Sequence, residues 1–369
     1  MILILFGLLF LVVIAGVVFL NTSPEFGGTI SIAEREKHER SLNFKDGVFV
    51  NLGGVSMSFG FSAFVKSLKG YLSKQPNAVP SKNIEVVYLD SSAVANYNGP
   101  TRLVWFGHST FLMQTNGKHI LIDPMFGNVP APHPIFGGSR FSKELPISLA
   151  QLPRLDAVIF SHDHYDHLDY GFVVALKDKV DRFYTPLGLG AHLKEWGIEA
   201  GRITELDWWD AVTMDELTFT CTPAQHFSGR GIMDKGKTLW SGWAISSRTE
   251  NLFFSGDSGY GQHFKEIGVR LGPFDFAMME CGQYNELWKE IHMMPEETAQ
   301  AGVAVNATAI MPIHWGSFKL AMHPWTEPVA RLSKKAEELG LPIIVPRIGA
   351  PIYMNKLKPI SNNWWEEVN

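Results

Sequence analysis

Short apolar runs, rich in β-branched and aromatic residues, recur along the chain from about residue 101 and predict a succession of β-strands. The runs at 110–114 and 119–122 flank Asn116-Gly117, a dipeptide typical of tight hairpins. Further strands are expected at 103–106, 155–160, 182–184, 203–207, 211–214, 217–221, 240–246, 251–254, 274–279, 309–313 and 343–345, and helices at 170–176, 187–196, 295–305 and 334–339. This succession predicts the α/β fold class, with two mixed sheets packed face to face and helices outside, a four-layer αββα sandwich.

The first twenty residues form a continuous apolar run, and no charged side chain appears before Glu25. A helix of this length covers roughly 30 Å, the hydrocarbon thickness of a bilayer. We therefore expect one N-terminal transmembrane helix, retained as a single-pass membrane anchor; a cleaved signal peptide is the alternative, although no basic residue precedes the run. The basic residues Arg35, Lys37 and Arg40 favour the cytoplasmic side of the membrane, and the extracytoplasmic side stays open.

Composition narrows the class of protein. Of 369 residues 46% are apolar, enough for one large domain with a substantial core. The formal net charge of -5 argues against a nucleic-acid-binding protein, which normally carries a basic face. Cys221 and Cys281 are the only cysteines in the sequence, so neither a disulfide framework nor a cysteine-based zinc site is expected.

The stretch Ser161-His162-Asp163-His164-Tyr165-Asp166-His167-Leu168-Asp169, here called the metal loop, directly follows the predicted strand at 155–160. Isolated charges are costly to bury, so this density of imidazoles and carboxylates requires partners, and a divalent metal provides them. The spacing lets one extended turn aim His162 and His164 at one ion, and Asp166 and His167 at a second. Mixed imidazole and carboxylate ligands suit zinc, with iron and manganese as alternatives.

Three later strands also end close to residues that bind metals in proteins. His226, Asp257 and His314 each follow a predicted strand, and Asp257 lies in a glycine-rich turn. Strand ends on a rigid sheet hold ligands in fixed positions, so these side chains are candidates for the same metal centre.

The pattern His162-x-His164-x-Asp166-His167 after a hydrophobic strand resembles the metallo-β-lactamase fold superfamily of metal-dependent hydrolases. Three further stretches resemble the bacterial relatives of N-acyl-phosphatidylethanolamine-hydrolysing phospholipase D: Trp105-Phe106-Gly107-His108-Ser109-Thr110, Thr222-Pro223-Ala224-Gln225-His226 and Phe254-Ser255-Gly256-Asp257-Ser258-Gly259-Tyr260. This resemblance implies the αββα sandwich and two divalent metal ions, with Zn2+ preferred. One ion would be held by His162, His164 and His226, the other by Asp166, His167 and His314, with Asp257 bridging them.

The chain thus divides into four expected parts. Residues 1–20 form the transmembrane anchor, 21–100 a lead-in segment packed on or near the catalytic domain, 101–355 the metallo-hydrolase domain and 356–369 a C-terminal tail. The lead-in contains a predicted charged helix at 32–42. It also contains an amphipathic segment at 57–72 that either lies near lipid or packs on the domain. The pairs Trp208-Trp209 and Trp364-Trp365 are either interfacial anchors or core residues.

Two residues are expected to support the metal centre. Asp123, at the end of a predicted strand, is a candidate to accept a hydrogen bond from a metal-binding histidine, with a simple turn residue as the alternative. His108 lies next to strands, and we expect it to pack beneath the site in a structural role.

Catalysis and substrate contact involve a further set of candidates. By resemblance His292 lies near the substrate and acts in catalysis together with Asp166 and Asp257; a helix-capping region without chemistry is the alternative. Gln283 and Tyr284 follow a strand on the presumed site face, and with His292 they are the candidates for substrate binding.

These observations predict a membrane-anchored, dinuclear metal-dependent hydrolase. By resemblance it is a phosphodiesterase of phospholipase D type that acts on N-acyl-phosphatidylethanolamine or a related phospholipid, because two divalent ions lower the pKa of water enough for hydroxide to attack phosphorus. A metal-dependent lactonase or soluble phosphodiesterase of the same fold stays open, since fold and metal site do not fix the substrate. A non-catalytic, membrane-tethered metal-binding module also stays open. The expected partners are the phospholipid substrate and the membrane, and a homodimer would agree with the enzymes that the chain resembles.

Overall fold

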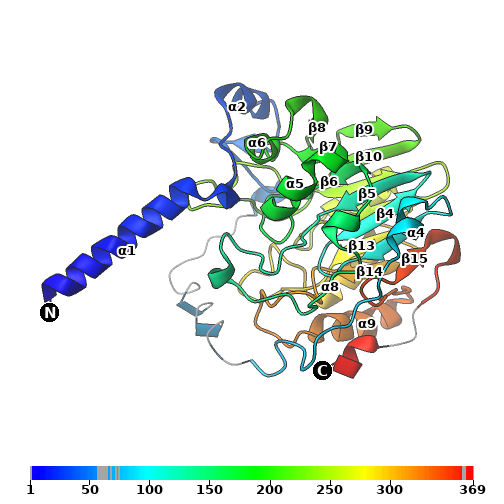
Figure 1. Cartoon of the computed structure of the whole chain (residues 1–369). Helices are drawn as coiled ribbons and strands as arrows, with labels where there is room; N and C mark the ends of the chain where they lie inside the picture. The colour runs from blue at the N-terminus through cyan, green and yellow to red at the C-terminus, as the bar shows by residue number, and fades with distance from the viewer. Residues whose placement is uncertain are drawn as a thin grey trace.

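The computed structural model of the chain describes residues 2–55, 65–66, 69–70, 73, 75–359 and 363–368. The amphipathic segment predicted at 57–72 falls largely outside these residues and stays a prediction. Within the described residues, two large β-sheets stack face to face and helices cover both outer faces (Figure 1). The predicted αββα architecture is confirmed.

The first sheet has seven strands in the order β15-β3-β4-β5-β6-β7-β8. Its strands are β3 (Arg102–Trp105), β4 (Phe111–Thr115), β5 (Lys118–Ile122), β6 (Leu155–Ile159), β7 (Val180–Pro186), β8 (Ile203–Leu206) and β15 (Pro351–Tyr353). The strands from β15 to β5 pair antiparallel, whereas those from β5 to β8 pair parallel. The parallel half needs crossovers, and two of them carry α5 (Tyr170–Leu176) and α6 (Gly190–Glu195) across the outer face.

The second sheet has six strands in the order β14-β13-β12-β11-β10-β9. They are β9 (Ala211–Met214), β10 (Leu217–Thr222), β11 (Gly242–Ser246), β12 (Asn251–Phe254), β13 (Phe276–Glu280) and β14 (Ile310–Ile313). Its outer face is covered by α7 (His263–Leu271), α8 (Pro295–Ala304) and α9 (Glu327–Leu339). The three strands β12 to β14 run parallel, so their carboxyl ends share one edge.

Three apolar layers hold the four structural layers together. On β4, Phe111 and Met113 point into the core between the sheets, whereas Leu112 points to the outer core beneath α5 and α6. The third layer packs α7 and α9 on the second sheet through residues such as Phe264 and Leu332. Since both faces of each sheet are covered, most strand residues are buried in near-continuous apolar runs rather than alternating with polar ones.

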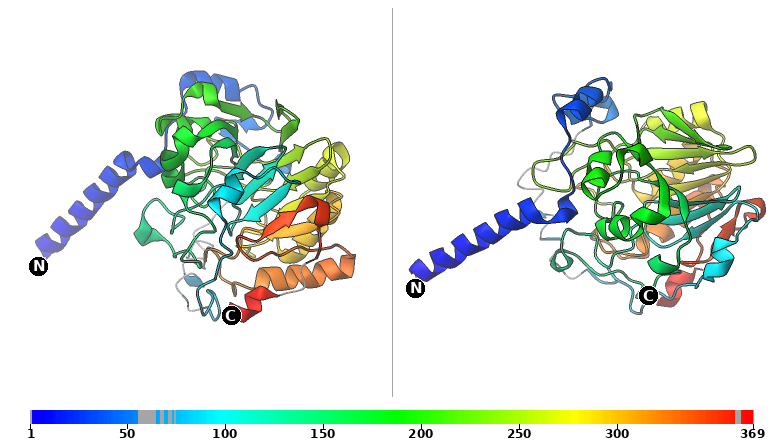
Figure 2. Two further views of the ribbon diagram at one scale, coloured as in Figure 1. Left: turned by 45° about the vertical axis from the view of Figure 1, so that its right-hand side comes forward. Right: turned by 45° about the horizontal axis from the view of Figure 1, so that its top comes forward.

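The segment before β3 lies against the sandwich at several points. It contains α1 (Ile2–Thr22), α2 (Ile32–His38), the two-stranded sheet β1 (Phe44–Lys45) and β2 (Val48–Phe49), and α4 (Ser91–Ala95). Phe49 and Ile84 belong to the core between the sheets. The helix α1 projects away from the body, and an 18-residue window within Ile4–Thr22 is apolar enough to cross a membrane, with none of that window buried (Figures 1 and 2).

The C-terminal residues are also part of the core. Trp364 and Trp365 are 1% and 4% exposed, and the Trp364 ring stacks on Trp315 with centroids 5.8 Å apart. Trp208 is likewise buried, so core packing rather than interfacial anchoring describes these tryptophans. The core therefore takes side chains from both sides of the expected limits at 101 and 355.

Two secondary-structure expectations were wrong. Residues 343–345 form no strand, and Ile343 makes only a single bridge to Ile310; the last strand is β15, which pairs with β3 and forms the edge of the first sheet. The helix α7 was not expected because its sequence is of mixed polarity and contains Gly268, which weakens an isolated helix. Its buried face, with Phe264 and Ile267, stabilises it by packing on the second sheet.

Candidate metal centre

The metal loop follows β6 and closes as a tight turn. The backbone N–H groups of His167 and Leu168 both donate to the carbonyl of His164, at 3.0 and 2.8 Å. The carboxylate of Asp169 then accepts from the N–H of Gly171 and caps α5. This turn directs the side chains of the loop toward the ends of β10, β12 and β14.

One group of imidazoles converges from two loops. His162 and His164 come from the metal loop, and His226 follows β10. His164 Nδ1 lies 2.9 Å from His162 Nε2 and 3.2 Å from His226 Nε2. All three nitrogen atoms lie within 4.8 Å of one another, a separation that a single ion can bridge. The structure thus brings together the three residues that the resemblance assigns to one metal.

A second group lies beside the first. Asp166, His167 and His314 offer ligand atoms within 4.8 Å of one another, and His108 belongs to the same group. His108 is completely buried, and its Nε2 lies 2.8 Å from Asp166 Oδ2. The sequence placed His108 beneath the site, but its direct contact with a predicted ligand was not foreseen. Its left-handed backbone between β3 and β4 is what turns the ring toward the metal loop.

Asp257 lies between the two groups. Its Oδ2 is 3.2 Å from His167 Nε2, 3.8 Å from His226 Nε2 and 3.9 Å from His162 Nε2. Its Oδ1 is 3.2 Å from His314 Nδ1. One carboxylate therefore faces both groups, which is the position that a bridging ligand requires.

The residues fit two cations. Three buried atoms at the centre have no hydrogen-bond partner among the described residues: His167 Nε2, Asp257 Oδ1 and His314 Nδ1. Leaving buried polar atoms unpaired costs free energy, and each of these atoms is of a type that binds divalent metals. The donor set contains imidazole nitrogen and carboxylate oxygen but no thiolate, because Cys221 and Cys281 are buried elsewhere in the fold.

The other nitrogen of three imidazoles is already occupied. His167 Nδ1 lies 2.7 Å from Asp123 Oδ2, His226 Nδ1 lies 3.0 Å from the carbonyl of Ile291, and His162 Nδ1 lies 2.9 Å from Ser161 Oγ. Asp123 thus makes the contact that was expected of it. It also accepts from the backbone N–H of Ser161, which fixes the start of the metal loop. Such contacts orient the ring and select the nitrogen that is left for a metal.

For most of the ligand candidates the electrostatics give the protonation state that metal binding needs. Burial lowers the pKa of His162, His226 and His314 well below the usual range, so these rings are neutral. Burial alone would raise the pKa of Asp166 and Asp257, but nearby imidazoles, His167 above all, outweigh it and hold both carboxylates ionised. Neutral imidazole and ionised carboxylate are the ligating forms. The exception is His167: burial alone would lower its pKa, but Asp257, Asp166 and Asp123 outweigh burial and raise the pKa well above the usual range, so a metal must displace a proton from this ring.

A pocket opens over the two groups, with a volume of about 240 Å³. Its wall contains ligand candidates together with Phe227, Trp288, Ile291, Leu320, Gln283 and His292. His292 Nδ1 lies 3.2 Å from Glu280 Oε1, and Glu280, wholly buried at the end of β13, also accepts from the N–H of Met293. Burial raises the pKa of Glu280 to about 7, while Glu280 outweighs the effect of burial on His292 and raises the pKa of that imidazole. The sequence did not identify Glu280, although it directly precedes Cys281-Gly282-Gln283 at a strand end.

The two other substrate-contact candidates differ. Gln283 lines the pocket, but its amide is already bonded to the backbone of Phe318 and Leu320, so it holds the chain after His314 rather than offering free polar atoms. Tyr284 does not line the pocket: its hydroxyl donates to Glu327 Oε1 at 2.5 Å on α9. We therefore withdraw Tyr284 from the substrate site. Gln283 and Tyr284 lie beyond the end of β13, in a turn with a left-handed backbone at Gln283, and sequence position alone does not predict the side-chain directions in such a turn.

The family model described as the β-lactamase superfamily domain matches residues 118–315, a range that begins at β5 and runs past the last ligand candidate, His314. The chain belongs to the β-lactamase superfamily. An uncharacterized protein of Mycobacterium tuberculosis is 39% identical over 362 residues, which cover 94% of this chain and 93% of that protein. The N-acyl-phosphatidylethanolamine-hydrolyzing phospholipase D 1 of Caenorhabditis elegans is 36% identical over 228 residues, 58% of this chain and 64% of that protein.

The solved structures agree on the fold. A metallo hydrolase from the archaeon Ignicoccus hospitalis superposes with a TM-score of 0.53 at 21% identity, and the match covers 69% of this chain and 98% of that one. The chain is therefore a hydrolase of the metallo-β-lactamase superfamily that resembles N-acyl-phosphatidylethanolamine-hydrolysing phospholipase D, as its motifs predicted.

Proposed function

We propose that this superfamily member is a membrane-anchored, dinuclear metal phosphodiesterase of phospholipase D type that acts on N-acyl-phosphatidylethanolamine or a related phospholipid. The observation that carries the proposal is the pair of converging ligand groups with Asp257 between them. The name of the Caenorhabditis elegans relative supplies the substrate class.

In this proposal His162, His164 and His226 hold one ion, and Asp166, His167 and His314 hold the other. Asp257 contacts both. Zn2+ suits this mixture of nitrogen and oxygen ligands, with iron or manganese as alternatives. When bound, two divalent ions lower the pKa of water and neutralise charge on the phosphoryl oxygens.

Side chains of the protein then protonate the leaving group. Hydrolysis adds water across the bond between phosphorus and the head-group oxygen, so that oxygen must gain a proton as the bond breaks. Of the titratable side chains that line the pocket, His292 alone lies outside the proposed ligand set. Its contact with Glu280 holds the ring in the wall of the pocket, between His226 and His314. We assign to His292 the transfer of this proton, and to Glu280 the positioning of His292.

The helix α1 supports membrane anchoring. It is long and apolar enough to cross a bilayer, and no residue of the apolar window is buried. An anchored enzyme remains beside a substrate whose acyl chains never leave the membrane. The basic residues Arg35, Lys37 and Arg40, which follow α1, favour the cytoplasmic face.

The test is the release of N-acylethanolamine and phosphatidic acid from vesicles that contain N-acyl-phosphatidylethanolamine, using the purified full-length protein. We expect release that a chelator and Asp166→Asn both abolish. Asp178→Asn, on an exposed turn after α5, is the matched control and should keep full activity. A protein that holds about two metals per chain yet releases nothing would contradict the lipid substrate, and a panel of lactones and soluble phosphodiesters would then be assayed.

A further inference from the structure

Two short loops, far apart in the sequence, expose large apolar side chains near the C-terminal end of α1. In residues 133–136, Ile135 and Phe136 are 75% and 60% exposed. In residues 231–234, Ile232 and Met233 are 73% and 89% exposed. We call these two segments the docking loops. Single exposed apolar residues are common on proteins, but four on two loops around one point form a patch.

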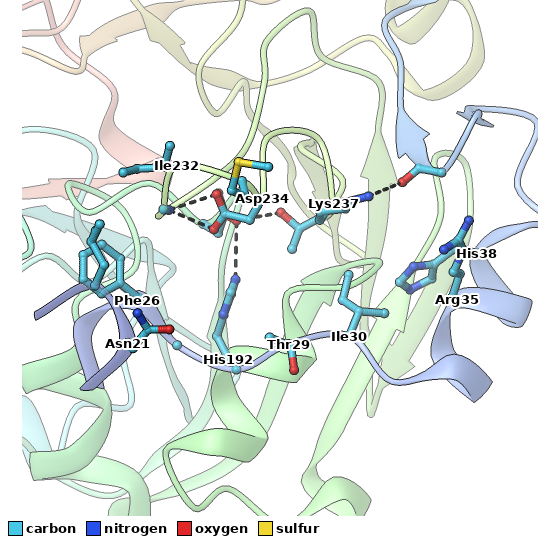
Figure 3. Close-up of a pocket in the computed structure, with 18 of the residues that line it drawn as sticks. Asn21, Phe26, Thr29, Ile30, Arg35, His38, His192, Ile232, Asp234 and Lys237 are labelled. Atoms are coloured by element: carbon cyan, nitrogen blue, oxygen red, sulfur yellow. Dashed lines mark hydrogen bonds and ion pairs between the residues drawn. The ribbon is translucent and has the colours of Figure 1, made fainter. Parts of the chain in front are cut away.

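Both docking loops adjoin the end of α1. The ring of Phe19, in the last turn, lies with its centroid 6.1 Å from that of Phe136. Ile232 and Met233 line the same cavity as Leu20 and Asn21, with a volume of about 780 Å³. Figure 3 shows Ile232, Phe26 and Asn21 together at one side of this cavity. The loops thus flank the point where α1 joins the body.

The backbones of both loops are fixed. His133 accepts from the N–H of Ile135 and starts a short 3-10 turn, so that Ile135 and Phe136 project from it. The carboxylate of Asp234 accepts from the N–H groups of Arg230 and Gly231, which closes the second loop behind its apolar tip. Ordered backbones that hold apolar side chains in solvent are typical of contact surfaces.

We infer that the docking loops form a membrane-contact surface, whose tips enter the lipid headgroup region around the end of α1. This inference rests on the proposed anchor. If Ile4–Thr22 crosses a bilayer, the membrane surface lies at the level of Leu20 and Thr22, and the side chains that flank these residues are at the interface. Ile, Met and Phe gain free energy when they leave water for this region.

The second docking loop is tied directly to the metal loop. Arg230, which is buried, donates from its guanidinium to the carbonyls of Asp163 and Leu168, at 2.6 and 2.9 Å. It also donates to the carbonyl of Glu25, just after α1. The N–H of Gly229 donates to Asp163 Oδ1 at 2.8 Å. One side chain therefore connects the end of the anchor, the loop and the metal loop.

Because the second docking loop is bonded to the metal loop, it limits the distance between the membrane and the metal centre. Phe227 lines the pocket over the metal groups, and its ring lies 4.5 Å from that of His164. Ile232 is five residues further on, so the two α-carbons are at most about 18 Å apart. A bilayer in contact with the loop tip is thus held within one short loop of the active site.

Fluorescence quenching tests the inference on the full-length protein in phosphatidylcholine vesicles. Cys221 and Cys281 are fully buried, so a single introduced cysteine can be labelled selectively with an environment-sensitive dye. The labelled variants are Ile135→Cys and Ile232→Cys on the loops, Val12→Cys within α1, and Val269→Cys as the matched control. Val269 is 74% exposed, like Ile232, but lies on α7, on the other side of the sandwich from α1 (Figure 2). The quencher is phosphatidylcholine with a doxyl group, placed near the glycerol for the loop and control variants and near the end of the acyl chain for Val12→Cys, which lies midway along the apolar span.

We expect strong quenching at 12, 135 and 232 and none at 269. Quenching at 12 but no more at 135 and 232 than at 269 would overturn the docking surface and leave the anchor intact. No quenching at any position would overturn the anchor and the docking surface together. A dye at 232 whose emission shifts to the blue without quenching would show that protein, not lipid, covers the loop, and would also overturn the inference.

Discussion

The metal centre and the docking loops reverse the ordinary distribution of side chains in opposite ways. At the metal centre, polar groups such as Asp257 and His314 are buried to 2% exposure. On the docking loops, apolar groups such as Met233 are almost fully exposed. Buried charge and exposed apolar surface both cost free energy in water. In each region this free-energy cost indicates a binding partner that would reduce it: a cation at the metal centre and lipid at the docking loops.

The regions also differ in how they are held. Polar ligands are fixed by hydrogen bonds to their side chains, as Asp123 holds His167. On the docking loops, the side chains of His133 and Asp234 accept hydrogen bonds from the backbone, while the tips Ile232 and Met233 stay exposed. The metal centre should therefore be sensitive to single changes, and the docking loops tolerant of them.

The largest effect is expected from Asp257→Asn. Asp257 faces both ligand groups, so its loss weakens both sites and leaves buried imidazoles without their counter-charge. Activity on vesicles should fall to background, and metal analysis should find fewer ions per chain. Retention of both metals with full activity would show that Asp257 does not lie between them.

The next largest effect is on the free energy of unfolding. Trp364→Ala removes a side chain that is 1% exposed. Its ring packs on Trp315, the residue that directly follows His314. The expected loss is about 3–5 kcal/mol. Denaturant unfolding in detergent measures it, and a loss below about 1 kcal/mol would show that the C-terminal residues do not belong to the folded core.

A smaller effect is expected from Asp123→Ala. This change leaves His167 a possible ligand but frees its ring, and supporting contacts of this kind are worth about 10- to 100-fold in metal affinity. Chelator competition measures the affinity. Asp181→Ala, which removes a surface carboxylate paired with Arg154, is the matched control and should leave the affinity unchanged.

The smallest effect on folding is expected from Ile232→Asp. Since this side chain is exposed, the free energy of unfolding should change by no more than about 0.5 kcal/mol. Turnover of vesicle phospholipid should nevertheless fall several-fold, whereas Val269→Asp should not change it. Equal turnover in the two variants would show that Ile232 contributes no more to activity on vesicles than an ordinary exposed residue such as Val269.

Much of the candidate site could be predicted from the sequence because its chemistry is local. The metal loop places four predicted ligands within six residues, and the strands before His226 and His314 are recognisable from their apolar runs. The fold class followed from the same runs. Asp123 was also found, since a carboxylate at the end of a strand is a common partner for a metal-binding histidine; a simple turn residue was the alternative.

Long-range contacts could not be predicted in this way. Glu280 and His108 touch the site only because β13 and the turn after β3 bring them there, and Tyr284 turns away although its neighbour Gln283 does not. The pairing of β3 with β15 could not be predicted either, because β15 lies some 250 residues later in the chain.

The sequence by itself determined the ligand types, the strands that carry them, the superfamily and the apolar N-terminal helix, because each depends on residues close together in the chain. Only the tertiary structure decided that two separate loops flank the end of α1, and that Arg230 joins the second of them to the metal loop. The sequence does not reveal that an isoleucine is exposed or that it belongs to an apolar patch, since both depend on the residues that lie beside it in space. Burial and proximity are properties of the packed chain, and they are set by contacts that sequence patterns do not encode.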